Sequence, residues 1–155
     1  CYGAVRQWVE DRYDCVSYPT LEADDCVGLL ADRYRGHEVH ISGDKDFKTI
    51  PGLFFDFLHD AWFEISEEQA YKNFLAQVMI GDAADNYKGC PGIGPKTADK
   101  VLEKYGVVWK TVVDQFKKAG LSEGEALQQA RVAHILNKEE EYDVCKYKVT
   151  LWNPN

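Results

Sequence analysis

Apolar side chains recur every three to four residues in six segments of the chain, a spacing that predicts six helices. The segments cover Val5–Tyr13, Thr20–Asp25 through to Gly36, Ser66 to the region of Asp82, Thr97–Tyr105, Trp109–Ala119 and Ser122–Asn137. The third helix begins with the capping-box pair Ser66 and Gln69, and the last begins with the pair Ser122 and Glu125. The predicted apolar face of the second helix consists of Ala23, Cys26, Val27, Leu30, Ala31 and Tyr34. That of the third consists of Ala70, Tyr71, Phe74, Leu75, Val78 and Met79.

Shorter apolar runs predict five strands. They are Cys15–Tyr18, Glu38–Ser42, the run GLFFDFL at 52–58, the run AWFEI at 61–65 and Tyr147–Trp152, with 52–58 and 61–65 forming a hairpin. This order indicates an α/β fold in which part of a parallel or mixed sheet with flanking helices is followed by a helical region. We place the α/β part at residues 1–80 and the helical part, including a helix-hairpin-helix, at 81–155.

Composition narrows the class of protein. At 155 residues, with 45% hydrophobic and 13% aromatic content, the chain is long and apolar enough for one globular domain. No apolar run approaches the ~20 residues of a membrane span. The five cysteines are scattered, without a CxxC pair, which argues against zinc and against a disulfide framework. A reducing cytoplasm is therefore the expected location.

The acidic residues occur in three clusters, each at the beginning or end of a predicted element. The clusters are Glu22, Asp24 and Asp25; Asp44 and Asp46; and Asp82 and Asp85. Each cluster alone has an ordinary structural explanation: a helix cap, an aspartate turn and a solvated helix end. If a strand continued through Asp44 and Asp46, or a helix through Asp82 and Asp85, each pair would share one face.

Taken together, the three clusters favour a metal site. Mg²⁺ prefers carboxylate oxygens with few protein ligands per ion, so seven acids suit two ions of Mg²⁺ or Mn²⁺. Two such ions support phosphodiester hydrolysis without a histidine. The four histidines show no ligand spacing and are interpreted as structural. A net charge of −8 is then compatible with nucleic-acid binding, because many acids would be cation ligands.

A glycine turn follows the third acidic cluster in the sequence GCPGIGPK. Gly92 and Gly94 permit a tight connection between two helices, and Pro95 suits the first position of the second helix. The free N–H groups at that helix start, with Lys96 beside them, predict a phosphate site that reads no bases. The expected DNA-binding residues are Gly92, Gly94, Lys96, Thr97 and Lys100, and an ordinary helix–helix turn is the alternative.

The segments LEADD, SGDKDF and GDAADNYKGCPGIGPKTA resemble the flap endonuclease / 5′-nuclease superfamily, in particular phage 5′→3′ exonucleases and the 5′-nuclease domain of DNA polymerase I. The resemblance extends from about Tyr18 to Tyr105 and keeps the order of three motifs. It implies a PIN/5′-nuclease-like fold and a phage origin, with the cytoplasm of a bacterial host as the location.

The resemblance also implies roles for single residues. Glu22 and Asp24 match acids of a first metal site, and Asp25 matches an additional acid of bacterial and phage members. Asp44, Asp46 and Asp85 match ligands of a second site, with Asp82 as a companion. The segment 89–98 matches a helix-hairpin-helix that grips duplex DNA and often holds K⁺ on backbone carbonyls, here those of Cys90 and Ile93.

One departure concerns the front of the chain. Family members begin with an aspartate-bearing strand, a second aspartate and a basic helical arch, none of which precedes Val5–Tyr13 here. The sequence is therefore expected to be the carboxyl-terminal portion of a nuclease, with a missing N-terminal segment or chain as a partner. Its activity in isolation is an open question.

Three interpretations of function follow. The leading one is a magnesium-dependent 5′→3′ exonuclease or structure-specific flap endonuclease acting on duplex, flapped or nicked DNA, with RNase H-type action as an extension. The second is a non-catalytic DNA-binding module that uses the helix-hairpin-helix alone. The third is a calcium-binding or structural acidic domain. DNA binding without cleavage supports the second, and absence of salt-sensitive DNA binding supports the third.

Overall fold

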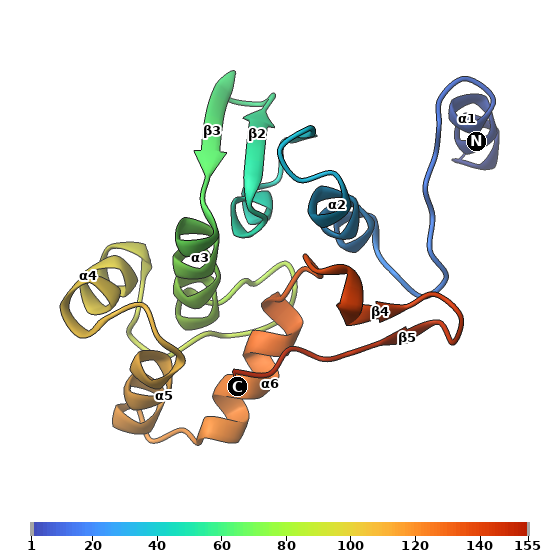
Figure 1. Ribbon diagram of the computed structural model, residues 1–155. Helices are drawn as coiled ribbons and strands as arrows, with labels where there is room; N and C mark the ends of the chain where they lie inside the picture. Colours follow the sequence, from blue (N-terminus) through green and yellow to red (C-terminus); the bar gives the residue numbers. More distant parts are fainter. Residues whose placement is uncertain (1, 155) are drawn as a thin grey trace.

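The computed structural model describes residues 2–154 (Figure 1). The elements are α1 (Tyr2–Glu10), α2 (Ala23–Arg33), β1 (Val39–Ser42), the 3₁₀ helix η1 (Lys45–Thr49), β2 (Gly52–Asp56), β3 (Ala61–Ile65), α3 (Glu67–Ile80), α4 (Pro95–Tyr105), α5 (Trp109–Lys118), α6 (Glu123–Ala133), the 3₁₀ helix η2 (Glu139–Glu141), β4 (Tyr142–Asp143) and β5 (Lys148–Val149).

A three-stranded mixed sheet confirms the predicted α/β part. β1 pairs with β2 in parallel, and β2 pairs with β3 in an antiparallel hairpin. Phe55 on β2 lies opposite Trp62 on β3, with ring centroids 4.7 Å apart. One face of this sheet packs inward through residues such as Phe54, whereas Ile41 and Trp62 on the other face are exposed.

Helix α3 connects the sheet to the helical part of the molecule. Its Ala70 packs with the sheet core around Ile50 and Phe54. Further along the same helix, Phe74 and Val78 belong to a second core built with α4, α5 and α6. The predicted apolar face of α3 is confirmed, with Tyr71 half-buried at its edge. Because one helix serves both cores, the division of the chain near residue 80 stays a prediction.

The buried face of helix α2 matches the predicted one only in part, with Val27 partly buried against the core. Cys26, Gly28, Leu29 and Ala31 are buried, while Ala23 and Tyr34 are exposed. The buried face includes Gly28, because a Cβ added there would lie 1.9 Å from the carbonyl oxygen of Leu136. The segment after α6 therefore approaches α2 at its smallest residue, a relationship that apolar periodicity does not register.

Three further predictions were wrong at the level of element bounds. The predicted strand over Cys15–Tyr18 is extended backbone without a partner strand in residues 2–154. The last helix ends at Ala133 rather than near Asn137, and the terminal strand is limited to Lys148–Val149, paired with β4. Short apolar runs fit several backbone states, and only the partner decides between them.

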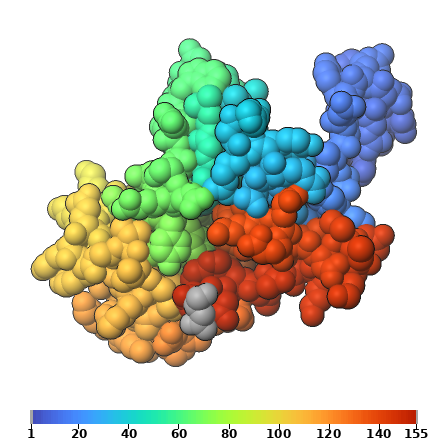
Figure 2. Space-filling model, viewed as in Figure 1, coloured from blue at the N-terminus to red at the C-terminus, as the bar shows by residue number. Residues whose placement is uncertain are grey.

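Helix α1 lies away from the remainder of the molecule and buries none of its residues (Figures 1 and 2). None of the helices in residues 2–154 combines the length and apolar character needed to cross a bilayer.

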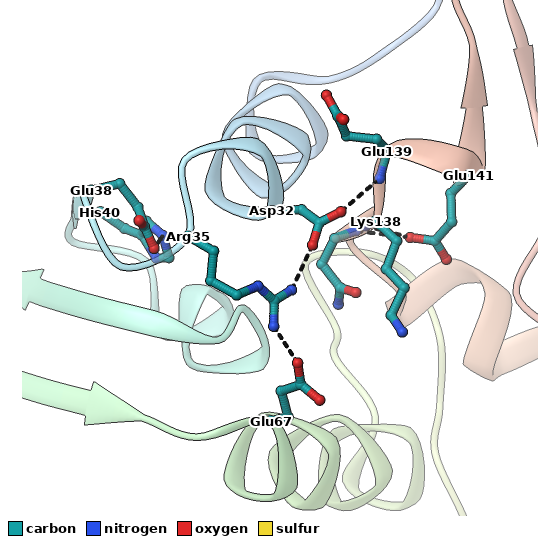
Figure 3. A network of polar contacts seen from close by, with 9 residues as sticks. Asp32, Arg35, Glu38, His40, Glu67, Lys138, Glu139 and Glu141 are labelled. Carbon is teal, nitrogen blue, oxygen red and sulfur yellow. Dashed lines mark hydrogen bonds and ion pairs between the residues drawn. The ribbon is translucent and has the colours of Figure 1, made fainter.

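Charged side chains tie the ends of α2 and α3 to the segment around η2 (Figure 3). Arg35 pairs with Asp32 and with Glu67 at the start of α3. Asp32 also accepts a hydrogen bond from the backbone N–H of Glu139 at 3.0 Å. The Asp32–Glu139 contact joins the first third of the chain to its last third, and the Arg35–Glu67 pair joins α2 to the start of α3.

Candidate metal centre

The loop between α3 and α4 is closed by two glycines. α3 does not continue into the acidic cluster; it ends at Ile80, and Gly81 adopts φ +80. A Cβ on Gly81 would lie 2.4 Å from the carbonyl carbon of Lys88, and one on Gly89 would lie 2.4 Å from that of Ile80. The two strands of chain therefore touch at positions where only glycine fits.

Within this loop, Asp82 and Tyr87 exchange two backbone hydrogen bonds of 2.9 and 3.0 Å. Gly89 N–H also donates to the side chain of Gln129 on α6 at 2.5 Å. The condition for a shared helix face of Asp82 and Asp85, a helix that continues through both, is thus not met. They are brought to one place by a short closed loop, whose backbone bonds fix its shape.

Asp46, Asp82 and Asp85 form one carboxylate cluster. One oxygen from each lies within 4.8 Å of the others. Asp46 comes from η1, which follows β1, and the other two come from the loop 81–89. Three carboxylates at this separation repel one another, and oxygen ligands so arranged fit a divalent cation. The residues present therefore fit one such ion.

The strand does not continue through Asp44 and Asp46 either. β1 ends at Ser42, and Asp44 is the N-cap of η1, where its Oδ1 accepts from the N–H of Asp46 at 2.9 Å. Asp44 thus orients Asp46 and lies outside the three-carboxylate cluster. Burial raises the pKa of Asp46, with Lys45 acting in the opposite direction, so a nearby cation favours its charged form.

Lys45 contacts the cluster directly. Its Nζ lies 2.5 Å from Asp82 Oδ2 and 3.7 Å from Asp46 Oδ1. The other oxygen of Asp82 accepts from the N–H of Ala84 at 2.7 Å. The hydrogen bond with Lys45 is the main cause that lowers the pKa of Asp82, and the same bond raises the pKa of Lys45.

The first acidic cluster faces the same cavity of about 290 Å³ as two members of the carboxylate cluster. The acids that line this cavity are Glu22, Asp24, Asp25, Asp46 and Asp85. Glu22 is the N-cap residue of α2 but its side chain makes no capping bond, and Asp24 Oδ1 accepts from the N–H of Asp25 at 2.9 Å. Glu22, Asp24 and Asp25 do not form a second three-ligand group within residues 2–154.

Two polar residues of this cavity were missed by the sequence interpretation. Gln77 from α3 and Arg131 from α6 both line it. Arg131 is held by the carbonyl oxygen of Trp152, to which its Nε donates at 3.2 Å. Neither residue belongs to a recognisable motif, since Gln77 and Arg131 come from two different helices that meet at the cavity.

The turn before α4 has the predicted geometry, and its role as a phosphate site stays a prediction. Gly92 has φ +80 with open space around it, Gly94 is the N-cap of α4, and Pro95 occupies its first turn. Lys96, Thr97 and Lys100 are exposed on this helix, and Ile93 is half-buried against the helical core. The carbonyl of Cys90 accepts from the N–H of Ile93 at 3.1 Å, which closes the turn.

Comparison with known proteins places these features in a family. The sequence is 30% identical to an exodeoxyribonuclease of Enterobacteria phage T3, over 93% of this chain and 59% of the relative. It is 34% identical to DNA polymerase I of Bacillus caldotenax, over 83% of this chain and 16% of that protein. The chain belongs to the 5′-nuclease superfamily.

The fold of the chain is also found in a solved 5′-exonuclease structure. A solved structure of T5 5′-exonuclease with divalent zinc ions bound superposes with a TM-score of 0.72, at 16% identity, over 86% of this chain and 57% of that one. No family model matches the sequence. The chain spans about three fifths of the length of the phage T3 and T7 relatives.

Proposed function

We propose that the chain carries the metal-binding and DNA-gripping part of a 5′→3′ exonuclease or structure-specific flap endonuclease that hydrolyses DNA phosphodiesters with Mg²⁺. The observation that carries this proposal is the convergence of Asp46, Asp82 and Asp85 within 4.8 Å. The family supports the chemistry, since relatives are named exonucleases and a flap endonuclease. A cytoplasmic location accords with this role.

The three carboxylates would hold one ion, and Glu22, Asp24 and Asp25 across the cavity would hold the second. When bound, the ions would supply Lewis-acid activation of water and stabilisation of the leaving oxygen. The protein's own part is to fix the ligands. Asp44 orients Asp46 through η1. The close backbone contact between the Gly81 and Gly89 ends of the loop 81–89, called the glycine contact below, fixes that loop.

The turn 89–94 and the start of α4 would hold the sugar-phosphate backbone of duplex, flapped or nicked DNA. The first N–H groups of α4 have no helical acceptor, and the helix dipole favours a phosphate there. Lys96 adds a positive charge on the same turn. A K⁺ ion on the carbonyls of this turn would serve the same purpose, with Cys90 and Ile93 as the proposed donors.

Two measurements test the proposal. Metal-free protein is titrated with Mn²⁺, and 5′-labelled duplex and flap DNA are incubated with the chain and Mg²⁺, alone and with a polypeptide that supplies the arch-bearing front of the fold. Stoichiometric Mn²⁺ binding that Asp46→Asn and Asp85→Asn weaken, together with Mg²⁺-dependent cleavage in at least one sample, is expected. Absence of both metal binding and cleavage contradicts the proposal.

The second candidate is a structure-specific DNA-binding module without catalysis. It is favoured by the turn and α4, which are complete and separate from the carboxylate cluster. It predicts DNA binding of equal strength in EDTA and in Mg²⁺, with no cleavage in any combination.

A further inference from the structure

A single lysine offsets part of the negative charge of the carboxylate cluster. Among residues 2–154, Lys45 is the only cation paired with Asp46, Asp82 or Asp85. Three carboxylates with oxygens within 4.8 Å of one another would otherwise repel in the absence of an ion. The ammonium group therefore stands where the charge balance of the cluster requires a cation.

The backbone around Lys45 places its side chain next to the loop 81–89. It is the first residue of η1 and lies between the cap Asp44 and the ligand Asp46. The cap bond from Asp46 N–H to Asp44 Oδ1 fixes this backbone, from which the side chain reaches the loop 81–89. The contact joins two segments that are 37 positions apart in the chain.

The same contact competes with a metal ion. Oδ1 of Asp82 is engaged by the N–H of Ala84, and Oδ2 by Lys45 Nζ. A divalent ion that takes Asp82 as a ligand must share or replace the ammonium at that carboxylate. The lysine side chain is 69% exposed, so it can swing into solvent without disturbing a packed core.

We infer that Lys45 is a built-in counter-ion of the metal centre. Its ammonium pairs with Asp82 and Asp46 while no divalent ion is bound and leaves Asp82 when an ion enters, so Lys45 sets the affinity of the centre for that ion. This inference rests on the proposed function, because it presupposes that the cluster binds a metal.

The matched control lies in the same 3₁₀ helix. Lys48 is a lysine three residues further on whose Nζ lies 4.1 Å from the centroid of the Phe63 ring, away from the carboxylates. Lys45→Gln and Lys48→Gln remove the same charge from the same helix. Only Lys45→Gln removes the competitor.

The experiment is a calorimetric titration of metal-free protein with Mn²⁺. Loss of one positive charge next to a dication predicts a Kd about tenfold lower in Lys45→Gln, and little change in Lys48→Gln or in the charge-conserving Lys45→Arg. The melting temperature of metal-free Lys45→Gln should fall, so that its rise on adding Mn²⁺ is larger than in the wild type. An unchanged or higher Kd in Lys45→Gln overturns the inference.

A second measurement needs only the wild type. The ammonium resonance of Lys45 in a lysine-selective NMR spectrum should change towards that of a solvated lysine as Mg²⁺ saturates the site. A resonance that stays unchanged at saturation overturns the inference even if Lys45→Gln fails to fold. A wild type that binds no divalent ion refutes the proposed function itself, whereas binding that is insensitive to Lys45 refutes this inference alone.

Discussion

Asp25 Oδ1 accepts a hydrogen bond of 3.0 Å from the backbone N–H of Leu136, which joins the first turn of α2 to the segment after α6. The two residues are 111 positions apart, and the bond lies beside the close approach of Gly28 to the Leu136 carbonyl. Burial raises the pKa of Asp25, and the Leu136 N–H opposes that rise. Asp25 is thus a structural partner as well as a proposed metal ligand.

These two roles separate by substitution. Asp25→Asn keeps a carbonyl oxygen for the Leu136 N–H, whereas Asp25→Leu leaves that buried N–H without an acceptor. We expect Asp25→Leu to lower the free energy of unfolding by about 1–3 kcal/mol, and Asn to change it much less. Urea unfolding measures both. Equal destabilisation by the two variants would show that the hydrogen bond to Leu136 does not matter.

Gly81 and Gly92 provide a second matched pair. Both have φ +80, but an added Cβ meets the backbone of Lys88 at 2.4 Å in the first case and open space in the second. We expect Gly92→Ala to cost about 1–2 kcal/mol in unfolding free energy, from the left-handed backbone alone. Gly81→Ala should cost more, and should also weaken Mn²⁺ binding, because it opens the loop that carries Asp82 and Asp85. If Gly81→Ala is as stable as Gly92→Ala, the glycine contact does not constrain the loop 81–89.

The glycine contact is an example of a feature that the sequence did not predict. Within residues 2–154, local patterns predicted segments that overlap α1 to α6 and β1 to β3, and they predicted the buried face of α3. They could not find the contact between Gly81 and Lys88 or the hydrogen bond from Leu136, since these depend on chain segments that meet only after folding. Asp44 and Asp82 illustrate the result: the acidic motif marked both residues, but only the fold shows that one caps η1 and the other joins the cluster.

The same distinction gives a prediction for metal affinity. Asp46→Asn and Asp85→Asn each remove a charged oxygen from the cluster, and we expect the Kd for Mn²⁺ to rise at least about tenfold in each. Asp44→Asn retains an oxygen that can cap η1, so its effect on Mn²⁺ affinity should be smaller. Calorimetry on the three variants and the wild type decides the matter. An effect of Asp44→Asn as large as that of Asp46→Asn would place Asp44 among the ligands.

Glu141 predicts a pH dependence of stability. Its Oε1 accepts from His134 Nε2 at 2.7 Å. Its Oε2 accepts from the backbone N–H groups of Asn137 and Lys138, and Figure 3 shows Glu141 beside Lys138. Burial alone would raise the pKa of Glu141, but these hydrogen bonds outweigh it and lower the pKa below its usual 4.5. The stabilisation is therefore fully present above pH 4.5 and is lost as the pH falls through the folded-state pKa.

Glu141→Gln should accordingly be less stable than the wild type at pH 7, by about 1–3 kcal/mol for bonds to a charged acceptor. The difference should narrow as the pH falls below 4.5 in the unfolding titration. Glu140→Gln is the control, because Glu140 directly precedes Glu141 in the same 3₁₀ helix and makes no such bonds in the described residues. A stability difference between Glu141→Gln and the wild type that does not change with pH would exclude the carboxylate as its source.

Lys96 should contribute to DNA binding through charge alone. It is exposed on the first turn of α4, next to helix N–H groups that have no helical acceptor. We expect Lys96→Gln to weaken binding to all duplex sequences alike, and to reduce the slope of log K against log salt by about 0.9, the value for one phosphate contact. Lys110→Gln on α5 is the matched control, since Lys110 Nζ is already paired with Asp114 at 2.6 Å. Fluorescence anisotropy measures the slope, at salt concentrations between about 50 and 200 mM. EDTA in the buffer makes the result independent of any bound metal. An equal change of slope in both variants would mean that DNA does not lie against the start of α4.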